Sequence, residues 1–225
     1  MSCTVLMVAE KPSLAEAITK ILAPNGQFHT RKSITPVHEY NAEFRGSPSK
    51  FRFTSVTGHV YGLDFTQKHN NWDIDPILLF DAPTLRKEAS KTNICKHLQQ
   101  ESKSVDYVVL WLDCDREGEN ICFEVIDNVR DRMKKIPGQS EDSRILRAKF
   151  SAITAIDIRK AMNNLVYPNK NESLAVDARQ ELDLKIGCAF TRFQTRFFQG
   201  KYGNLDSSVI SYGPCQTPTL SFCVS

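Results

Sequence analysis

The sequence lacks several features that would each define a class of protein. No apolar run approaches the roughly 20 residues that span a membrane, and only six residues separate Cys3 from Glu10, too few for a signal peptide. No GxxxxGKS or GxxxxGKT loop is present, so ATP is not implied. No CxxC or Cys/His zinc spacing appears either. We therefore expect neither a membrane protein nor a P-loop enzyme nor a zinc-stabilised domain.

The sequence also lacks a large excess of either charge, because the formal net charge is only +3 over 225 residues. Any binding of nucleic acid must therefore depend on local basic patches and not on a global field. The hydrophobic fraction of 41% is enough for a real core. The cysteines are odd in number and scattered, which favours reduced thiols in a cytosolic or nuclear protein. They occupy positions 3, 95, 114, 122, 188, 215 and 223.

An acidic segment follows directly on the apolar run of residues 107–112, which is typical of a buried strand in a parallel sheet. Asp113 and Asp115 would point to the same side of the extended chain, and Glu117 can join them once the chain turns. Like charges gathered in one place raise one another's pKa unless a cation neutralises them. Carboxylate oxygens suit Mg²⁺, so the segment predicts a magnesium site that handles phosphate.

A second acid, Glu10, ends another short apolar run, residues 4–9. Pro12 disfavours helical geometry at Lys11, and Ser13 with Glu16 has the spacing of a capping box for a helix. Strand, turn and helix begin an α/β unit, in which ligands bind beyond the carboxyl ends of the strands. Glu10 and the acids after residue 112 are therefore predicted to share one edge.

Two other interpretations of the acidic segment stay open at this stage. Residues 113–124 have the spacing of a calcium-binding EF-hand loop, with Gly118 sixth and Glu124 twelfth. An EF-hand needs a helix before its loop, whereas residues 107–112 favour a strand. The other interpretation is a solvated acidic loop at the N-terminus of a helix running from Asn120 to Arg130, where negative charge is favourable.

The remaining pattern predicts a sheet-forming part followed by a helical part. Residues 37–44 and 50–56 favour two strands of a hairpin around the turn 46–48. Residues 66–93 have little periodicity and favour loops with short helical turns, and 94–104 favour a helix. Residues 145–150 favour a last strand, and Thr154 has the spacing of a helix cap. The turn cluster 163–171 is the preferred boundary, and a long helix is predicted from Ser173 to Thr195.

That long helix carries the residue-level argument for nucleic acid. One turn of this helix contains a guanidinium fork, an amide and an acid, which are Arg179, Gln180 and Asp183. The acid can orient the guanidinium toward a ligand. Further basic residues alternate with phenylalanines, a pattern that a solvated face beside an ordinary core face would also produce. The basic residues are Lys185, Arg192, Arg196 and Lys201.

Five ordered motifs resemble the type IA DNA topoisomerases, in particular their eukaryotic topoisomerase III branch. Residues 8–13 (VAEKPS), 56–60 (VTGHV) and 113–121 (DCDREGENI) are similar to the Toprim domain of that family. Residues 176–187 (VDARQELDLKIG) and 213–220 (GPCQTPTL) are similar to the domain that follows. The resemblance implies an α/β, Rossmann-like Toprim domain with a parallel sheet, expected over residues 1–168. It also implies the beginning of a mainly helical, single-strand-binding domain, expected over residues 169–225.

The resemblance implies transesterification of a DNA strand. Glu10 would be the general acid and Lys11 would offset charge on the phosphoryl oxygens, while Asp113, Asp115 and Glu117 would hold Mg²⁺. The implied contacts to single-stranded nucleic acid are His59, Arg179, Gln180, Asp183, Gln216 and Thr217.

The motif that contains the family's cleaving tyrosine is not found around any of the six tyrosines, so we expect this chain to be a front portion that is inactive alone. A silent single-strand-binding fragment is the alternative. Expected partners are single-stranded DNA, RNA as a second substrate, the rest of the enzyme and a Tudor-domain protein. The expected location is the nucleus, with the cytoplasm second.

Overall fold

The computed structural model describes residues 3–89, 92–201 and 208–224. The chain forms two compact units. The sheet unit comprises residues 1–61 and 88–176, and the long-helix unit comprises residues 62–87 and 177–225. Among the described residues, no helix combines the length and apolar character needed to cross a bilayer.

The sheet unit is organised around a six-stranded mixed sheet in which β1 is flanked by β4 and β7. These three strands are parallel, as is the β7–β8 pair, whereas β2, β3 and β4 pair antiparallel. The predicted parallel sheet is thus confirmed in its central part. In spatial order the strands are β2 (His29–Arg31), β3 (Val37–Phe44), β4 (Ser47–Ser55), β1 (Cys3–Ala9), β7 (Tyr107–Trp111) and β8 (Ile145–Arg147).

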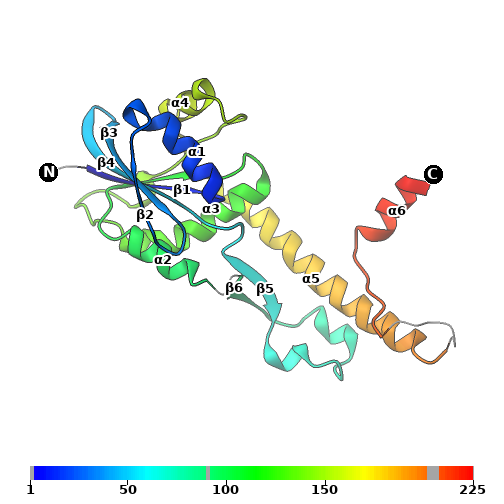
Figure 1. Cartoon of the computed structure of the whole chain (residues 1–225). Coiled ribbons are helices and arrows are strands. Elements are labelled where there is room, and N and C mark those ends of the chain that lie inside the picture. The colour runs from blue at the N-terminus through cyan, green and yellow to red at the C-terminus, as the bar shows by residue number, and fades with distance from the viewer. Residues whose placement is uncertain (1–2, 90–91, 202–207, 225) are drawn as a thin grey trace. The chain divides into compact units, whose positions relative to one another are not determined.

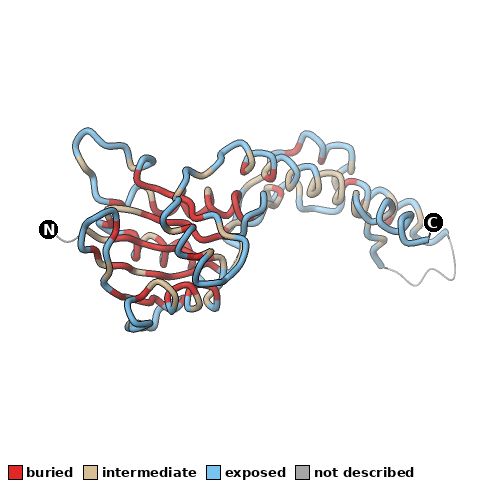
Figure 2. Tube along the Cα trace, turned by 90° about the horizontal axis from the view of Figure 1, so that it is seen from above, coloured by how far each residue is buried: buried red, intermediate tan, exposed pale blue. Residues whose placement is uncertain are grey.

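Helices cover both faces of this sheet, as Figure 1 shows. Successive strand side chains alternate between faces, so Leu6 and Val8 of β1 pack with α2 (Ile94–Glu101) and α3 (Arg116–Val129). Val5 and Met7 pack on the opposite face with α1 (Pro12–Leu22) and α4 (Ala155–Asn163). Because both faces are covered, β1 is buried from Val5 to Ala9, and Figure 2 shows how many buried residues the sheet unit contains. The packing on both faces therefore holds the ends of the central strands of the sheet in place.

The hairpin between β3 and β4 turns at Arg45 and Gly46, which both have positive φ (50° and 77°). Two consecutive residues of this kind form the two-residue turn that matches the twist of paired strands. The predicted hairpin is confirmed, but its turn was placed one residue too late and its second strand begins at Ser47, not Lys50. The predicted last strand is shorter than expected and ends at Arg147.

Two predicted helix starts need correction. Helix α1 begins at Pro12 with Lys11 in the N-cap position and no side-chain cap, so Ser13 lies inside the helix. Proline fits the first helical position because its missing N–H would have no partner there. Helix α3 begins at Arg116, before the predicted Asn120, because the Asp115 carboxylate caps it. The predicted cap at Thr154 is confirmed, since its hydroxyl accepts from the Asp157 N–H (3.2 Å).

The long-helix unit contains most of α5 (Lys170–Phe198), which extends the predicted helix at both ends. Residues 66–93 contain the expected helical turns η2 (Gln67–Asn70) and η3 (Pro76–Leu79). They also contain an unpredicted strand, β6 (Thr84–Glu88), which pairs with β5 (Tyr61–Phe65). The small core comprises Phe65, Leu79, Ala82 and Ala189. The remaining short elements are η1 (Pro24–Gly26), η4 (Arg130–Arg132), η5 (Asp142–Arg144) and α6 (Gln216–Val224).

Candidate active site at the carboxyl ends of the central strands

Three predicted site segments emerge from one edge of the sheet. β4, β1 and β7 are adjacent and parallel, with Ala9 of β1 paired to Ser55 on one side and Trp111 on the other. Glu10 follows β1, Gly58 and His59 follow β4, and Asp113 follows β7. The Gly58 N–H donates to the Glu10 carbonyl (3.2 Å), which ties two of these segments together. The chain crosses from one side of β1 to the other here, which is where open α/β sheets bind ligands.

Glu10 is a half-buried carboxyl beside Asp113. Its Oε2 accepts a weak hydrogen bond from the Asp113 N–H (3.4 Å). Partial burial raises the pKa of Glu10 above its usual value, and the charge of Asp113 adds to that rise, while the Asp113 N–H and Lys11 partly oppose it. A carboxyl with a raised pKa retains a proton more readily near neutral pH. The geometry therefore suits Glu10 for proton transfer.

Asp113 and Asp115 both lie exposed in the segment that joins β7 to α3. The Asp115 Oδ1 accepts from the Gly118 N–H (2.7 Å), so this carboxylate is also the N-cap of α3. A strand leads into the loop, which rules out the EF-hand interpretation, since that motif requires a helix there. The solvated-loop interpretation accounts for the cap but not for the neighbouring Glu10.

Glu117 is directed to His59. The His59 ring bonds two carboxylates of α3, with Nε2 at 3.1 Å from Glu117 and Nδ1 at 3.1 Å from Glu124. The Glu124 Oε2 also accepts from the Val60 N–H (2.7 Å), which anchors the segment after β4 to α3. The bond to Glu124 and its charge raise the pKa of His59, with Glu117 adding to the effect and burial opposing it. The predicted phosphate contact of His59 would compete with these carboxylates.

Arg147 supports the acidic segment from beneath, and sequence reasoning missed it. Its side chain is 0% exposed and pairs with the equally buried Glu119 (Nε to Oε2, 3.2 Å). The guanidinium also donates to the carbonyls of Asp113 (2.7 Å), Ala148 (2.7 Å) and Leu110 (3.3 Å). Glu119 in turn accepts from the Asn169 N–H (2.5 Å). A planar fork with several fixed acceptors holds the Asp113 backbone in one position.

Gly118 is required by the same close packing. A Cβ placed on it would lie 2.0 Å from the Asp113 carbonyl oxygen, far inside contact distance. The first turn of α3 can therefore approach the end of β7 only because residue 118 has no side chain. The signal was present in the sequence as the Gly within the acidic motif, but its physical reason appears only in the fold.

The donor chemistry at this edge is that of a divalent cation site. Asp113 and Asp115 offer exposed carboxylate oxygens, the ligands that hard cations prefer. Within the ranges that the structure describes, no three His, Cys, Asp or Glu side chains are already gathered in metal-binding geometry. An ion would therefore need these carboxylates to adjust around it.

The predicted residues of α5 lie in the long-helix unit. Arg179 and Asp183 are one turn apart, with Nη1 and Oδ2 separated by 3.8 Å, and both are largely exposed. Gln180 lies between them and is half-buried. Gln216 begins α6, and its Oε1 accepts from the Gly213 N–H (3.0 Å). Thr217 also belongs to α6, but its side chain lies outside the described part of the structure.

Two basic residues that the helical pattern singled out have structural partners. Arg192 is 6% exposed, donates to the carbonyls of His69 (3.1 Å) and Asn71 (2.8 Å), and lies over the Trp72 ring. Arg196 donates to the Ile74 carbonyl (3.2 Å). Both attach η2 or the segment after it to α5, so these side chains are less available for nucleic acid than the pattern indicates.

The fold and this acidic edge define the class of protein. Residues 5–153 match the Toprim domain family, and residues 167–225 match the DNA topoisomerase family. The chain therefore belongs to the Toprim domain family. Toprim domains bind a divalent metal, in keeping with the carboxylates at this edge.

Particular relatives confirm the topoisomerase resemblance. The chain is 60% identical to DNA topoisomerase 3-beta of Oryza sativa subsp. japonica over 226 residues, which cover 100% of this chain and 25% of the relative. It is 60% identical to DNA topoisomerase 3-beta-1 of Homo sapiens over 227 residues, covering 98% and 26%. The chain thus spans about a quarter of the length of these curated relatives. The expected similarity to the type IA family holds along the whole sequence.

A solved structure supports the fold alone. Full-length topoisomerase I of Thermotoga maritima superposes with a TM-score of 0.55 at 20% identity, over 96% of this chain and 29% of that one. The expected α/β Toprim fold followed by a helical part is confirmed. The boundary expected between residues 168 and 169 stays a prediction.

Proposed function

We propose that this chain supplies the Toprim half of the active site of a type IA DNA topoisomerase. The observation that carries the proposal is the meeting of Glu10 and Asp113 at the ends of two adjacent parallel strands. The 3-beta relatives support the reaction class, which is cleavage and religation of one strand by transesterification.

Glu10 would transfer the proton of this reaction. The phenolate oxygen of a tyrosine attacks a backbone phosphorus, the phosphorus–O3′ bond breaks, and the leaving oxygen takes a proton from Glu10, which becomes a carboxylate. Religation runs the same steps backwards, with Glu10 as the base. Its raised pKa supports this role, which contributes roughly 10²–10⁴-fold to rate. Lys11 would offset the negative charge that develops on the phosphoryl oxygens.

Asp113, Asp115 and Glu117 would hold the divalent ion, and Mg²⁺ suits their oxygen ligands. When bound, the ion neutralises the phosphate and lowers the pKa of the carboxylates that it contacts. Arg147 would keep the Asp113 backbone in place when the ion binds. Glu117 would have to leave or share its bond to His59 in order to contribute an oxygen.

In this proposal, polar residues of α5 and α6 would hold the single strand that leads to the cut. Arg179, Gln180 and Asp183 form one such group, and Gln216 and Thr217 form the other. Single-stranded DNA is the proposed substrate and RNA a second one. A Tudor-domain partner and a nuclear location, with the cytoplasm second, complete the proposal.

None of the six tyrosines is assigned the nucleophile. Burial raises the pKa of Tyr61 to about 12 and that of Tyr40 further, so both resist forming a phenolate. The decisive assay is relaxation of negatively supercoiled DNA by this chain with Mg²⁺, together with a trap for covalent adducts. We expect neither relaxation nor adduct, but retained binding of single-stranded DNA. Relaxation would instead place the nucleophile within the chain, and Tyr212→Phe would be the first variant to examine.

Metal binding tests the site itself without any need for turnover. We expect the chain to bind Mn²⁺, used as a paramagnetic stand-in for Mg²⁺, and the double variant D113N/D115N to lose most of that affinity. D73N/D81N removes two exposed aspartates of the long-helix unit and is the matched control. Equal Mn²⁺ affinity in the two double variants would contradict the assignment.

A further inference from the structure

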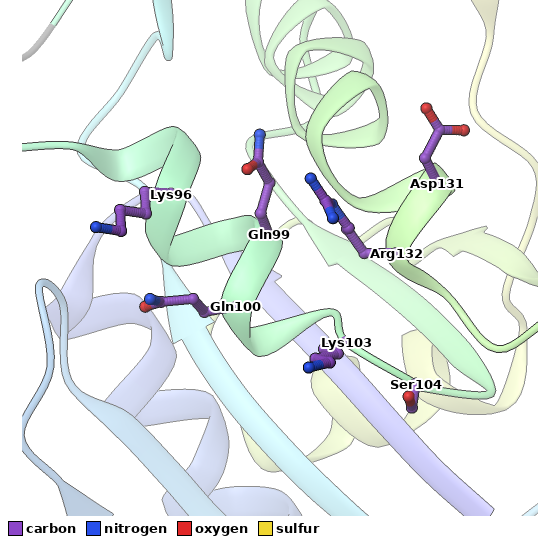
Figure 3. A pocket seen from close by; sticks show the side chains of 7 residues that line it. All are labelled: Lys96, Gln99, Gln100, Lys103, Ser104, Asp131 and Arg132. Atoms are coloured by element: carbon purple, nitrogen blue, oxygen red, sulfur yellow. The ribbon is translucent and has the colours of Figure 1, made fainter.

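A basic hollow lies between α2 and η4 in the sheet unit. It encloses about 460 Å³, within the range of small-molecule pockets. Figure 3 shows Arg132 of η4 extending toward Gln99 of α2, with the Asp131 carboxylate directed away from Lys96 and Gln100. The lining residues are Lys96, Gln99, Gln100, Lys103, Ser104, Asp131 and Arg132.

One wall of the hollow follows the helical period. Lys96, Gln99, Gln100 and Lys103 have the spacing i, i+3, i+4, i+7, so they share one face of α2 and its C-terminal extension. Each of these side chains presents N–H donors, and none is acidic. A helix face with cations and amides but no carboxylate differs from the usual solvated face, in which both signs of charge alternate.

The charges of the hollow are unbalanced. It contains three cations, Lys96, Lys103 and Arg132, and one carboxylate, Asp131. Among the described residues, no ion pair joins any of the three cations to a carboxylate. Lys103 follows the C-terminus of α2, where the helix dipole already favours a cation. Lys96 and Arg132 are therefore the main candidates to bind a ligand, because the dipole of α2 does not account for their positions.

The floor of the hollow is held by backbone hydrogen bonds. The Ser104 N–H donates to the Arg132 carbonyl (2.9 Å), and the Lys134 N–H donates to the Val105 carbonyl (3.0 Å). Arg144, which is 2% exposed, donates to the carbonyls of Asp106 and Lys134 (2.8 Å each). Ser104 itself has a φ of 60°, a left-handed conformation that is costly for serine. The loop is thus fixed with its hydroxyl-bearing residue on the rim of the hollow.

The hollow is separate from the acidic edge. It lies before the first residue of β7, whereas Asp113 follows the last one. A strand of five residues is roughly 17 Å long, so the hollow and the acidic edge lie at opposite ends of β7. A ligand here would meet cations and amides and would not meet the carboxylates of the candidate active site.

We propose that this hollow binds a phosphate group, either of a small diphosphate or of a nucleic-acid backbone. Arginine, lysine, amide and hydroxyl donors are the groups that contact phosphate oxygens. The volume exceeds that of one phosphate and admits a diphosphate or a short stretch of backbone. Three cations facing one acid favour a ligand with more than one negative charge.

The test is an NMR titration of the full chain in EDTA, so that no divalent ion links the probe to the acidic edge. The probes are inorganic pyrophosphate and a short oligothymidylate. We expect the amide signals of Lys103 and Ser104 and the side-chain amides of Gln99 and Gln100 to shift. In K96Q/R132Q, affinity at these signals should fall about tenfold or more, because charge-assisted hydrogen bonds are lost.

A matched control separates the site from net charge. R159Q/K160Q removes the same two residue types from an exposed face of α4 and should leave both affinities within about twofold of wild type. Response to pyrophosphate alone identifies a small diphosphate as the ligand, and response to the oligonucleotide identifies the backbone. Unshifted signals in the wild-type chain, or equal affinities in the two double variants, would overturn the proposal.

Folding is checked by the amide spectrum of each variant. If K96Q/R132Q loses its dispersed signals, K96Q alone is used, since the Lys96 side chain is exposed and forms no ion pair with the described residues. K160Q is then its control. The proposal does not depend on topoisomerase activity, so its failure and that of the proposed function are distinguishable.

Discussion

Arg147 of the sheet unit and Arg196 of the long-helix unit are held in different ways. In the sheet unit, Arg147 is 0% exposed and bonds a buried carboxylate and three carbonyls. In the long-helix unit, Arg196 is exposed and bonds one carbonyl, while Arg179 has a distant pairing with Asp183. The first arrangement fixes a backbone for chemistry, and the second leaves side chains able to adapt to a ligand.

The two units also differ in how completely they bury their apolar side chains. The sheet unit buries two clusters on the two faces of its sheet, whereas the long-helix unit has a small core around Phe65 and Leu79. Phe193 and Phe197 of α5 remain 58% and 48% exposed, and Leu220 of α6 is 61% exposed. Contiguous exposed apolar side chains mark surfaces that contact other molecules. The sheet unit therefore buries most of its apolar side chains in two clusters, whereas the long-helix unit exposes apolar side chains that can contact other molecules.

Removing Arg147 should produce the largest effect and would test the comparison most directly. Arg147→Ala leaves Glu119 buried without its cation, which costs about 3–5 kcal/mol in free energy of unfolding. Arg196→Ala should cost only about 0.5–1.5 kcal/mol. Denaturant unfolding with separate probes measures both, since Trp111 reports on the sheet unit and Trp72 on the long-helix unit. Similar losses in the two variants would erase the distinction.

Gly118→Ala should follow in size. The new methyl would overlap the Asp113 carbonyl, so α3 or the acidic segment must move, at a cost of about 1–3 kcal/mol. Metal affinity should fall with it because Asp113 is displaced. Gly62→Ala adds a methyl where nothing lies within 4 Å and serves as the control. Unchanged stability in G118A would show that the close approach is not maintained in solution.

Acidification should weaken the sheet unit by a smaller amount. Burial lowers the pKa of His97 below 6.5, while its ring bonds Thr54 (2.7 Å), Thr35 (3.0 Å) and Ser33 (3.0 Å). The unfolded chain binds a proton near pH 6.5 and the folded chain only at lower pH, so stability falls as the pH drops through this window.

Unfolding measured at several pH values should therefore give a shallower loss in H97Q than in the wild type. Glu101 raises and Arg31 lowers the His97 pKa, so both are kept intact in the comparison. H29Q, which removes an exposed ring, is the control. An identical slope in H97Q and wild type would exclude His97 as the source.

The smallest effect on stability is expected from the exposed aromatic pair. F193S/F197S should change the free energy of unfolding by no more than about 0.5 kcal/mol but reduce concentration-dependent association, measured by sedimentation velocity. Ile156→Ser removes one exposed apolar side chain of the sheet unit (81% exposed) and should leave association unchanged. Association that persists in F193S/F197S would show that this part of α5 is not a contact surface.

Much of the fold could be predicted because its signals are local. The apolar runs of β1 and β7, the hairpin near Gly46 and the cap at Thr154 each depend on a few neighbouring residues. β6 was missed because its pairing with β5 decides it. The early starts of α1 and α3 are set by local groups, Pro12 and the Asp115 carboxylate, which the prediction did not assign to the helix starts. Within the site, the acids are recognisable from the sequence, whereas Arg147 resembles any arginine in a short strand.

The sequence by itself determined the parallel α/β class, the order of the acidic and helical motifs and the list of acids that end strands. Only the tertiary structure decided that Glu10 lies beside Asp113, that Glu117 is directed to His59 and that Arg147 holds the acidic segment. The reason is physical. Strand pairing and burial bring together residues separated by 34 to 103 positions, and those contacts set the position of each group.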